Sequence, residues 1–288
     1  MPILADHKTR AICMNGTTKN AIFHMHQWLL YGTNVVGTVD HHSKKKSEES
    51  LPCFFSIQEA KKHTNANTCV LFCSPDTMAD AMLENIEAEI PLLICFTDHI
   101  PAHDFIEVLR IARQTKKTTI IGPASSGIIT PEQCNLSTIP TYLFQKGSVG
   151  IVSRSPLLLC EAACQMKEHA LGQSTCITIG NRERIGYSFI ETIEHFEHDP
   201  ETKVILLLGM ASGTLEYHTA QWLQHQTTKP ILVYLAGHHT AYHEEESPIT
   251  PQTTLSLFQK TDATVIKNPL EIGKEIACIL NPQKKREP

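Results

Sequence analysis

A polar turn near the N-terminus has the residue types of a phosphate-binding loop. Gly16, Thr17, Thr18 and Lys19 follow a short apolar run and precede a segment with helical period. Glycine lets the backbone approach a ligand closely, a threonine can cap the next helix, and the unpaired N–H groups of a helix start attract phosphate. Any turn between a strand and a helix needs similar residues, so the motif alone leaves both interpretations open.

A lysine run could add positive charge to this turn. Lys44, Lys45 and Lys46 come soon after the second apolar run of the chain. Lysines at the mouth of a cleft can hold a phosphate, whereas a run of like charges can also be a solvated loop. We expect Lys44 to contact the phosphates if a phosphorylated cofactor binds.

Two further polar pairs follow apolar runs. Ser74-Pro75 and Thr97-Asp98 form rigid, polar entrances to segments with helical period. Proline suits the first turn of a helix, and polar groups at such entrances can flank an adenine or a pantetheine arm. We therefore expect these four residues to line the same cofactor site.

The second half of the chain has another candidate anion site. Ser153, Arg154 and Ser155 end an apolar run and precede Pro156. The free N–H groups and the dipole of a helix that starts here could hold a phosphate or phosphoryl group. Ser155 could also be a plain helix cap.

Three histidines in the polar stretch 238–247 are the candidate catalytic side chains. His238, His239 and His243 have a spacing that can place ligands on one metal, and a neutral histidine can also accept a phosphoryl group. A solvated loop is the simplest interpretation, so we predict no metal site.

These motifs are positioned by an alternation of short apolar runs with longer segments of helical period, which is typical of parallel βαβ units. We predict an α/β fold with a Rossmann-like domain at 1–140 and a flavodoxin-like, parallel-sheet domain at 148–288, joined by a linker at 131–147. In such sheets ligands bind at the carboxyl ends of the strands. The expected strands span 10–14, 35–39, 69–73, 92–96, 118–121, 149–152, 175–179, 204–208, 231–235 and 264–266. The expected helices span 20–31, 57–62, 77–88, 102–114, 156–170, 188–197, 215–224, 251–260 and 269–280.

The composition excludes several classes of protein. Hydrophobic residues make up 41% of the 288 residues and charged residues 19%, which is globular rather than disordered composition. A formal net charge of -5 gives no reason to expect nucleic acid or an anionic membrane as a partner, and no apolar run is long enough to cross a bilayer. The ten cysteines lack paired metal-type spacing, so we expect reduced core cysteines in a cytoplasmic protein.

The order of the motifs resembles that of succinate–CoA ligase α subunits. The run KGSVGIVSRS, ending at Ser155, is similar to the start of that family's second domain. So are the segments at 171–176, 188–200 and 229–237, together with Gly122-Pro123 and the segment 127–132. The resemblance covers nearly the whole chain. It implies CoA binding by the first domain and acid–thiol ligase chemistry with ATP or GTP, in company with a β subunit that binds the nucleotide.

The family's chemical residues are the part that this chain does not match. The family phosphorylates a histidine in a Gly-His-Ala-Gly-Ala loop, which is absent here, and Met210 stands where the family has a glutamate against that histidine. A methionine cannot accept a charge-assisted hydrogen bond from an imidazole. The CoA-facing turn has lost two glycines, and the family's Asn-Cys-Pro is Ala124-Ser125-Ser126.

Two hypotheses about function follow. In the first, the chain is a pseudoenzyme that binds CoA or acyl-CoA and pairs with a ligase β-type subunit or with itself, because the fold is kept while the sites have changed. In the second, it is an active acyl-CoA ligase α-like subunit that uses His238, His239 or His243 instead. The neighbouring run of glutamates would oppose an incoming phosphate in that case.

Overall fold

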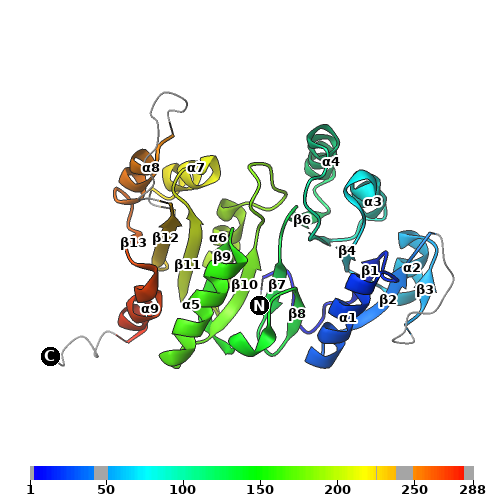
Figure 1. The fold of residues 1–288 in the computed structure, drawn as a ribbon, viewed down its shortest axis with the longest axis horizontal. Helices are drawn as coiled ribbons and strands as arrows, with labels where there is room; N and C mark the ends of the chain where they lie inside the picture. Colours follow the sequence, from blue (N-terminus) through cyan, green and yellow to red (C-terminus); the bar gives the residue numbers. More distant parts are fainter. Residues whose placement is uncertain (1–2, 42–50, 225, 238–248, 282–288) are drawn as a thin grey trace.

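Two sheets lie side by side in the computed structural model, which describes residues 3–41, 51–224, 226–237 and 249–281 (Figure 1). The first sheet is built from the N-terminal part of the chain and the second mostly from the C-terminal half. Parallel pairing dominates both sheets, so the predicted α/β class is confirmed.

The first sheet has the strand order β3-β2-β1-β4-β5-β6 with parallel neighbours, which is the Rossmann order. Its elements are β1 (Ala11–Met14), α1 (Lys19–Tyr31), β2 (Val35–Val39), β3 (Cys53–Phe54), α2 (Ile57–Thr64), β4 (Thr68–Leu71), α3 (Pro75–Glu87), β5 (Leu92–Cys95), α4 (Ala102–Thr115) and β6 (Thr119–Ile121). The two-residue strand β3 was not predicted from the sequence.

The second sheet has the order β13-β12-β11-β9-β10-β7-β8, and its five strands β9 to β13 are parallel. That parallel part has the flavodoxin order, in which the second strand lies outside the first. Its elements are β7 (Gly127–Thr130), β8 (Cys134–Ser137), a 3-10 turn (Thr141–Leu143), β9 (Lys146–Ser153), α5 (Pro156–Glu168), β10 (Gln173–Thr178), α6 (Phe189–His198), β11 (Val204–Met210), α7 (Thr214–Trp222), β12 (Ile231–Ala236), α8 (Pro251–Phe258), β13 (Thr264–Ile266), a 3-10 turn (Pro269–Glu271) and α9 (Ile272–Leu280).

The expected linker at 131–147 contains structure instead. Strands β7 and β8 form an antiparallel hairpin, and β7 pairs with β10 so that Ile128 faces Ile177. Short antiparallel strands at a sheet edge need no continuous apolar run, which is why the sequence pattern missed them. The domain division at 140 and 148 stays a prediction, because this hairpin comes from before position 140 yet pairs with the second sheet.

Buried side chains alternate between the two faces of each sheet. On β1, Ile12 and Met14 pack with α2, α3 and α4, whereas Ala11 and Cys13 face a second apolar cluster. That second cluster continues through α1 and the hairpin into the inner face of the second sheet, so one core joins the two halves. The indole of Trp28 adds a polar tie by donating to the carbonyl oxygen of Ser137 at 2.8 Å.

The cysteines lie mostly in these cores, as predicted. Cys13, Cys69 and Cys176 are buried in strands, and burial raises the pKa of each thiol. Burial likewise raises the pKa of Cys134 to about 12. These thiols therefore stay protonated and act as small apolar side chains.

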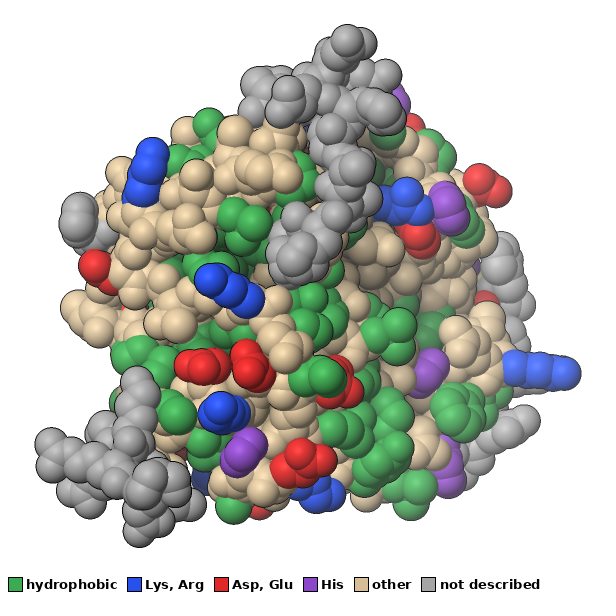
Figure 2. Space-filling model, turned by 60° about the vertical axis from the view of Figure 1, so that its left-hand side comes forward, with side chains coloured by type: hydrophobic (Ala, Val, Ile, Leu, Met, Phe, Trp, Pro, Cys, Tyr) green, Lys and Arg blue, Asp and Glu red, His purple; other side chains and the backbone are tan. Residues whose placement is uncertain are grey.

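Acidic and basic side chains are interspersed on the surface that Figure 2 shows, which is the face toward the second half of the chain. They do not form a continuous basic field there. Opposite charges mixed in this way suit an ordinary solvated face.

Candidate functional site

Most of the predicted site residues that the structure describes follow strands at or beside the point where the strand order of each sheet reverses. In the first sheet the order turns between β1 and β4, and in the second between β9 and β11. Open parallel sheets bind ligands at the carboxyl ends of strands at such points. The turn at 16–19 follows β1, the Ser74-Pro75 pair follows β4, the Thr97-Asp98 pair follows the neighbouring β5, and Ser153 to Ser155 follow or end β9.

The first turn is shaped by close packing against β2. A Cβ atom on Gly16 would lie 2.6 Å from the Cγ2 atom of Thr38, so only glycine fits without displacement. Thr18 is the N-cap of α1, and its hydroxyl accepts from the N–H of Ala21 at 3.3 Å. The hydroxyl of Thr17 donates to the buried carboxylate of Asp40 at the end of β2. The turn therefore leads directly into the N-terminus of α1, and the carboxylate of Asp40 lies beside the turn.

The next two strand ends are tied together by side chains. Thr97 donates to the carbonyl oxygen of Cys73 at 2.8 Å, which links the end of β5 to the end of β4. Ser74 is the N-cap of α3 with Pro75 in its first turn, but its hydroxyl bonds Thr77 at 3.0 Å rather than a backbone N–H. The structure thus brings the three predicted turns together at the carboxyl ends of three adjacent strands, β1, β4 and β5.

An aromatic cluster at the same edge was missed from the sequence. Phe72 follows β4 and Phe96 follows β5, with ring centroids 5.5 Å apart, and both contact His24 and Trp28 of α1. His24 is half-buried, and burial lowers its pKa. Its neutral ring therefore acts as part of an apolar wall beside the first turn. A phenylalanine directly after each of two adjacent strands was the signal available in the sequence.

An ion pair joins the two halves at the carboxyl end of β5. The guanidinium of Arg182, in the loop after β10, donates to both carboxylate oxygens of Asp98, at 2.6 and 2.5 Å. These hydrogen bonds lower the pKa of Asp98. The two residues line a hollow of about 480 Å³ together with His99, Pro123 and Glu183. Asp98 is thus engaged with the second half of the chain.

The second switch point has a helix start with a buried ion pair beneath it. Ser155 caps α5 by accepting from the N–H of Leu158 at 3.3 Å, and Ser153 donates to the carbonyl oxygen of Ser155 at 2.8 Å. Arg154 is buried and donates to the carboxylate of Glu216 in α7 at 3.1 Å. Its other terminal nitrogen donates to the carbonyl oxygens of Asn181 and Arg182. A phosphate at this helix start would be held by backbone N–H groups more readily than by Arg154.

Apolar side chains are exposed beside this helix start. Met210, the last residue of β11, is 44% exposed, and Leu157 in the first turn of α5 is 81% exposed. The N–H of Met210 donates to Glu216 at 2.7 Å, so the carboxylate of Glu216 points inward. Burial raises the pKa of Glu216 although Arg154 opposes that shift.

Four predicted residues cannot be placed. Lys44, His238, His239 and His243 lie outside the described residues. Within the part of the chain that the structure describes, no group of three histidine, cysteine or acidic side chains could hold a metal. In that same part, no helix has the length and apolar character that crossing a membrane requires.

A Rossmann-type sheet followed by a flavodoxin-type sheet, with a helix start at each switch point, defines a class of two-domain α/β proteins with ligand sites at strand ends. Two family models match in that order: a CoA binding domain over residues 6–99 and a succinyl-CoA ligase like flavodoxin domain over residues 146–260. The chain belongs to the succinate–CoA ligase α-subunit family. The resemblance inferred from the motifs is therefore confirmed.

The relatives and the similar structures agree with this assignment. The chain is 35% identical over 237 residues to the α subunits of ADP-forming succinate–CoA ligase from Staphylococcus epidermidis and Staphylococcus aureus, covering 82% of this chain and 78% of each relative. ATP citrate lyase from Methanothrix soehngenii, solved with citrate and coenzyme A, shares the fold with a TM-score of 0.83 at 21% identity. An acetyl-coenzyme A synthetase of Ca. Korarchaeum cryptofilum has a TM-score of 0.71 at 16% identity. These matches cover 99% and 91% of this chain but only 51% and 59% of those two structures.

Proposed function

We propose that this chain is a CoA- or acyl-CoA-binding α-like protein in which phosphoryl transfer is lost or altered. The observation that carries the proposal is the pairing at the second switch point. Met210 occupies the position where the family resemblance implies a glutamate, and the neighbouring Glu216 is buried and paired with Arg154. Met210 therefore offers no carboxylate to orient a histidine, and the carboxylate of Glu216 is already bonded to Arg154.

CoA binding is supported by the family description of residues 6–99 and by the first turn. The helix start at Thr18 supplies N–H groups for phosphate, and the half-buried rings of Phe72 and Phe96 supply an apolar wall beside it. The assignments of Gly16, Thr17, Lys19, Lys44, Ser74, Pro75, Thr97 and Asp98 to this site are part of the proposal.

The thermal unfolding of the purified protein tests CoA binding. A ligand that binds only the folded state at 100 times its Kd stabilises it by about 2.7 kcal/mol, which corresponds to a rise in Tm of roughly 5 °C for a chain of this size. Pantetheine, which lacks the adenosine and its phosphates, serves as the control and should give a smaller shift. An unchanged Tm with CoA would contradict the binding proposal.

Phosphoryl transfer is tested with a conventional ligase β subunit, CoA and ATP. We expect this chain to acquire no acid-labile phosphate, whereas a conventional α subunit under the same conditions should become labelled. Phosphate on His238, His239 or His243 that disappears when that residue becomes alanine would establish the alternative, an active acyl-CoA ligase α-like subunit. The retained helix start at Ser155 is the observation that favours this alternative.

Partner binding belongs to the same proposal. Leu157 and Met210 expose apolar surface beside the second switch point, which suits a ligase β-type subunit or a second copy of this chain. The ten unpaired cysteines favour a reducing compartment such as the cytoplasm. Light scattering of the chain alone and of the chain with a β subunit distinguishes the two partners. A chain that stays monomeric under both conditions would contradict both partner proposals.

A further inference from the structure

A crevice lies between α4 and the segment 183–191, and it extends to Leu215 in the first turn of α7. It consists of two adjoining hollows of about 740 and 750 Å³, which share Leu109 and Arg113 of α4 and Gly186 and Glu191 of the facing segment. The first hollow reaches Leu92 and Thr119, the first residues of β5 and β6, so it opens at the amino ends of the first sheet. Each hollow is large enough for a small organic molecule.

The crevice is more positive than the rest of the protein. Five cationic side chains line it and only two carboxylates do, although the whole chain has a net charge of -5. The cations are Arg110, Arg113, Lys116, Lys117 and Arg184, and the carboxylates are Glu183 and Glu191. Clefts lined by one sign of charge concentrate ligands of the opposite sign.

Several of these charges are already satisfied. Arg110 pairs with Glu107 and Lys117 pairs with Glu89, both outside the crevice. The carboxylate of Glu191 accepts from the N–H and hydroxyl of Ser188 in the capping box of α6. Glu183 likewise accepts from the hydroxyl of Thr214.

Three of the five cationic side chains that line the crevice are not accounted for by these pairs. Within the described ranges, Arg113, Lys116 and Arg184 have neither a hydrogen bond nor an ion pair from their side chains. They come from both walls of the crevice, the first two from the end of α4 and Arg184 from the opposite segment.

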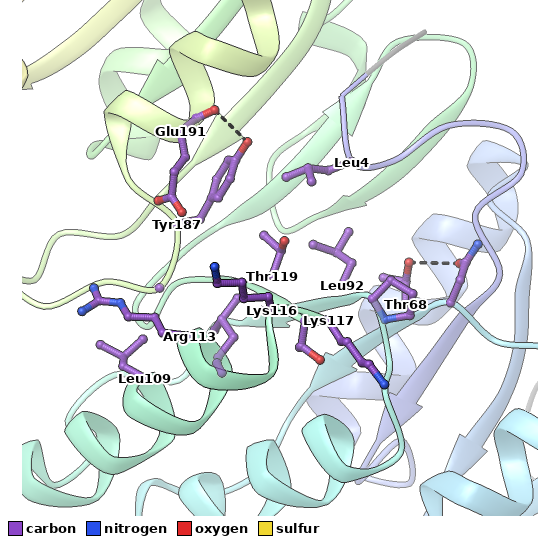
Figure 3. A pocket seen from close by; sticks show the side chains of 16 residues that line it. Leu4, Thr68, Leu92, Leu109, Arg113, Lys116, Lys117, Thr119, Tyr187 and Glu191 are labelled. Atoms are coloured by element: carbon purple, nitrogen blue, oxygen red, sulfur yellow. Dashed lines mark hydrogen bonds between the residues drawn. The ribbon is translucent and has the colours of Figure 1, made fainter. Parts of the chain in front are cut away.

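The dipole of α4 explains only part of this arrangement. Cations are favoured near a helix C-terminus, which accounts for Arg113 and Lys116. It does not account for Arg184, which lines the second hollow opposite Arg113. Lys116 has a φ of +54°, a conformation that glycine or asparagine usually adopts. Figure 3 shows its side chain extending toward the side of the cavity where Tyr187 and Glu191 lie, whereas Lys117 points away.

We propose that this crevice is a second ligand site, for a small phosphorylated molecule with an apolar body. Arg113 and Arg184 hold the phosphate from opposite walls, because a guanidinium fork matches two oxygens of a phosphate group. Lys116 adds charge from the first hollow. Ile106, Leu109 and Leu215 supply the apolar wall of the second hollow. This site is distinct from the turn at 16–19, and Arg184 also lines the adjoining hollow beside Asp98.

Calorimetric titration with phenyl phosphate, with and without excess CoA, tests the proposal. We expect saturable binding that persists when CoA is present. Arg113→Ala and Arg184→Ala should each weaken it by about tenfold, because each removes charge-assisted hydrogen bonds. Both side chains are exposed, so both variants should unfold at the same temperature as the parent protein.

Lys62→Ala is the matched control. Lys62 lies in the last turn of α2 and lines none of the hollows, so its loss should leave the affinity unchanged. Absence of saturable binding, equal weakening by Lys62→Ala, or displacement by CoA would overturn the site. Tighter binding of phthalate than of phenyl phosphate would overturn the phosphate class and make the ligand a carboxylate.

Discussion

Arg154 and Glu216 form a buried ion pair that holds the start of α5 against the start of α7. Their side chains are 3% and 0% exposed, and the shortest distance between them is 3.1 Å. The same carboxylate also holds the end of β11, because it accepts from the backbone N–H of Met210 at 2.7 Å. Arg154 is therefore part of a structural anchor, whereas phosphate binding at the helix start of Ser155 stays a prediction.

Breaking this pair should destabilise the protein strongly. Glu216→Ala leaves the guanidinium of Arg154 buried without its counter-ion, which typically costs 3–5 kcal/mol, about the same as Arg154→Ala. Urea denaturation should show a lower free energy of unfolding for each single variant. The free energy of unfolding of the double variant should fall by clearly less than the sum of the two single-variant losses, since no unpaired charge remains. Additive losses would contradict the pairing.

The ion pair between Asp98 and Arg182 should give a small, pH-dependent contribution. Because the folded-state pKa of Asp98 is lowered from 3.8, its contribution is present above pH 3.8 and is lost as the pH falls through the lower folded-state value. Both side chains are partly exposed, so we expect only a small contribution at neutral pH. Asp98→Asn should lower the free energy of unfolding at pH 7 and converge with the parent protein in acid. A difference that grows on acidification would be inconsistent with the pair.

The turn at Gly16 should be sensitive to one added methyl group. Gly16→Ala places a Cβ atom 2.6 Å from the Cγ2 atom of Thr38, and overpacking of this kind costs about 1–3 kcal/mol. Thr38→Ser removes that Cγ2 atom but keeps the Cβ atom of residue 38 at 2.9 Å, so the double variant should recover part of the stability that Gly16→Ala lost. Chemical denaturation of the three variants measures this. If Thr38→Ser gives no recovery, the contact with the Cγ2 atom is not the cause of the loss.

The negative charge of Asp40 should weaken CoA binding if the phosphates of CoA lie at the turn 16–19. Its carboxylate bonds Thr17, and a negative charge there opposes an approaching phosphate. Asp40→Asn keeps a hydrogen-bond acceptor for Thr17 but removes the charge, so CoA affinity should rise about threefold. Calorimetry at low and high salt checks this, and the gain should shrink as salt increases. An unchanged affinity at low salt would place the phosphates elsewhere.

Local pattern alone determined most of the secondary structure. The strands expected at 35–39 and 264–266 match β2 and β13 to the residue, because each is a short run rich in β-branched residues. Thr18 caps its helix as expected, and Ser155 is the helix cap that the sequence left open as an alternative, since capping depends on residues only three positions apart. The family could also be recognised from its consecutive motifs.

Only the tertiary structure decided which side chains meet. Arg154 and Glu216 are 62 positions apart and Asp98 and Arg182 are 84 apart, so no local period relates them. Arg154 looked like a phosphate ligand because its neighbours form a helix start, yet packing turns it inward to Glu216. That Arg113 and Arg184 line one hollow was hidden for the same reason. Secondary structure follows from neighbouring residues, whereas partners follow from how the two sheets pack on their shared core.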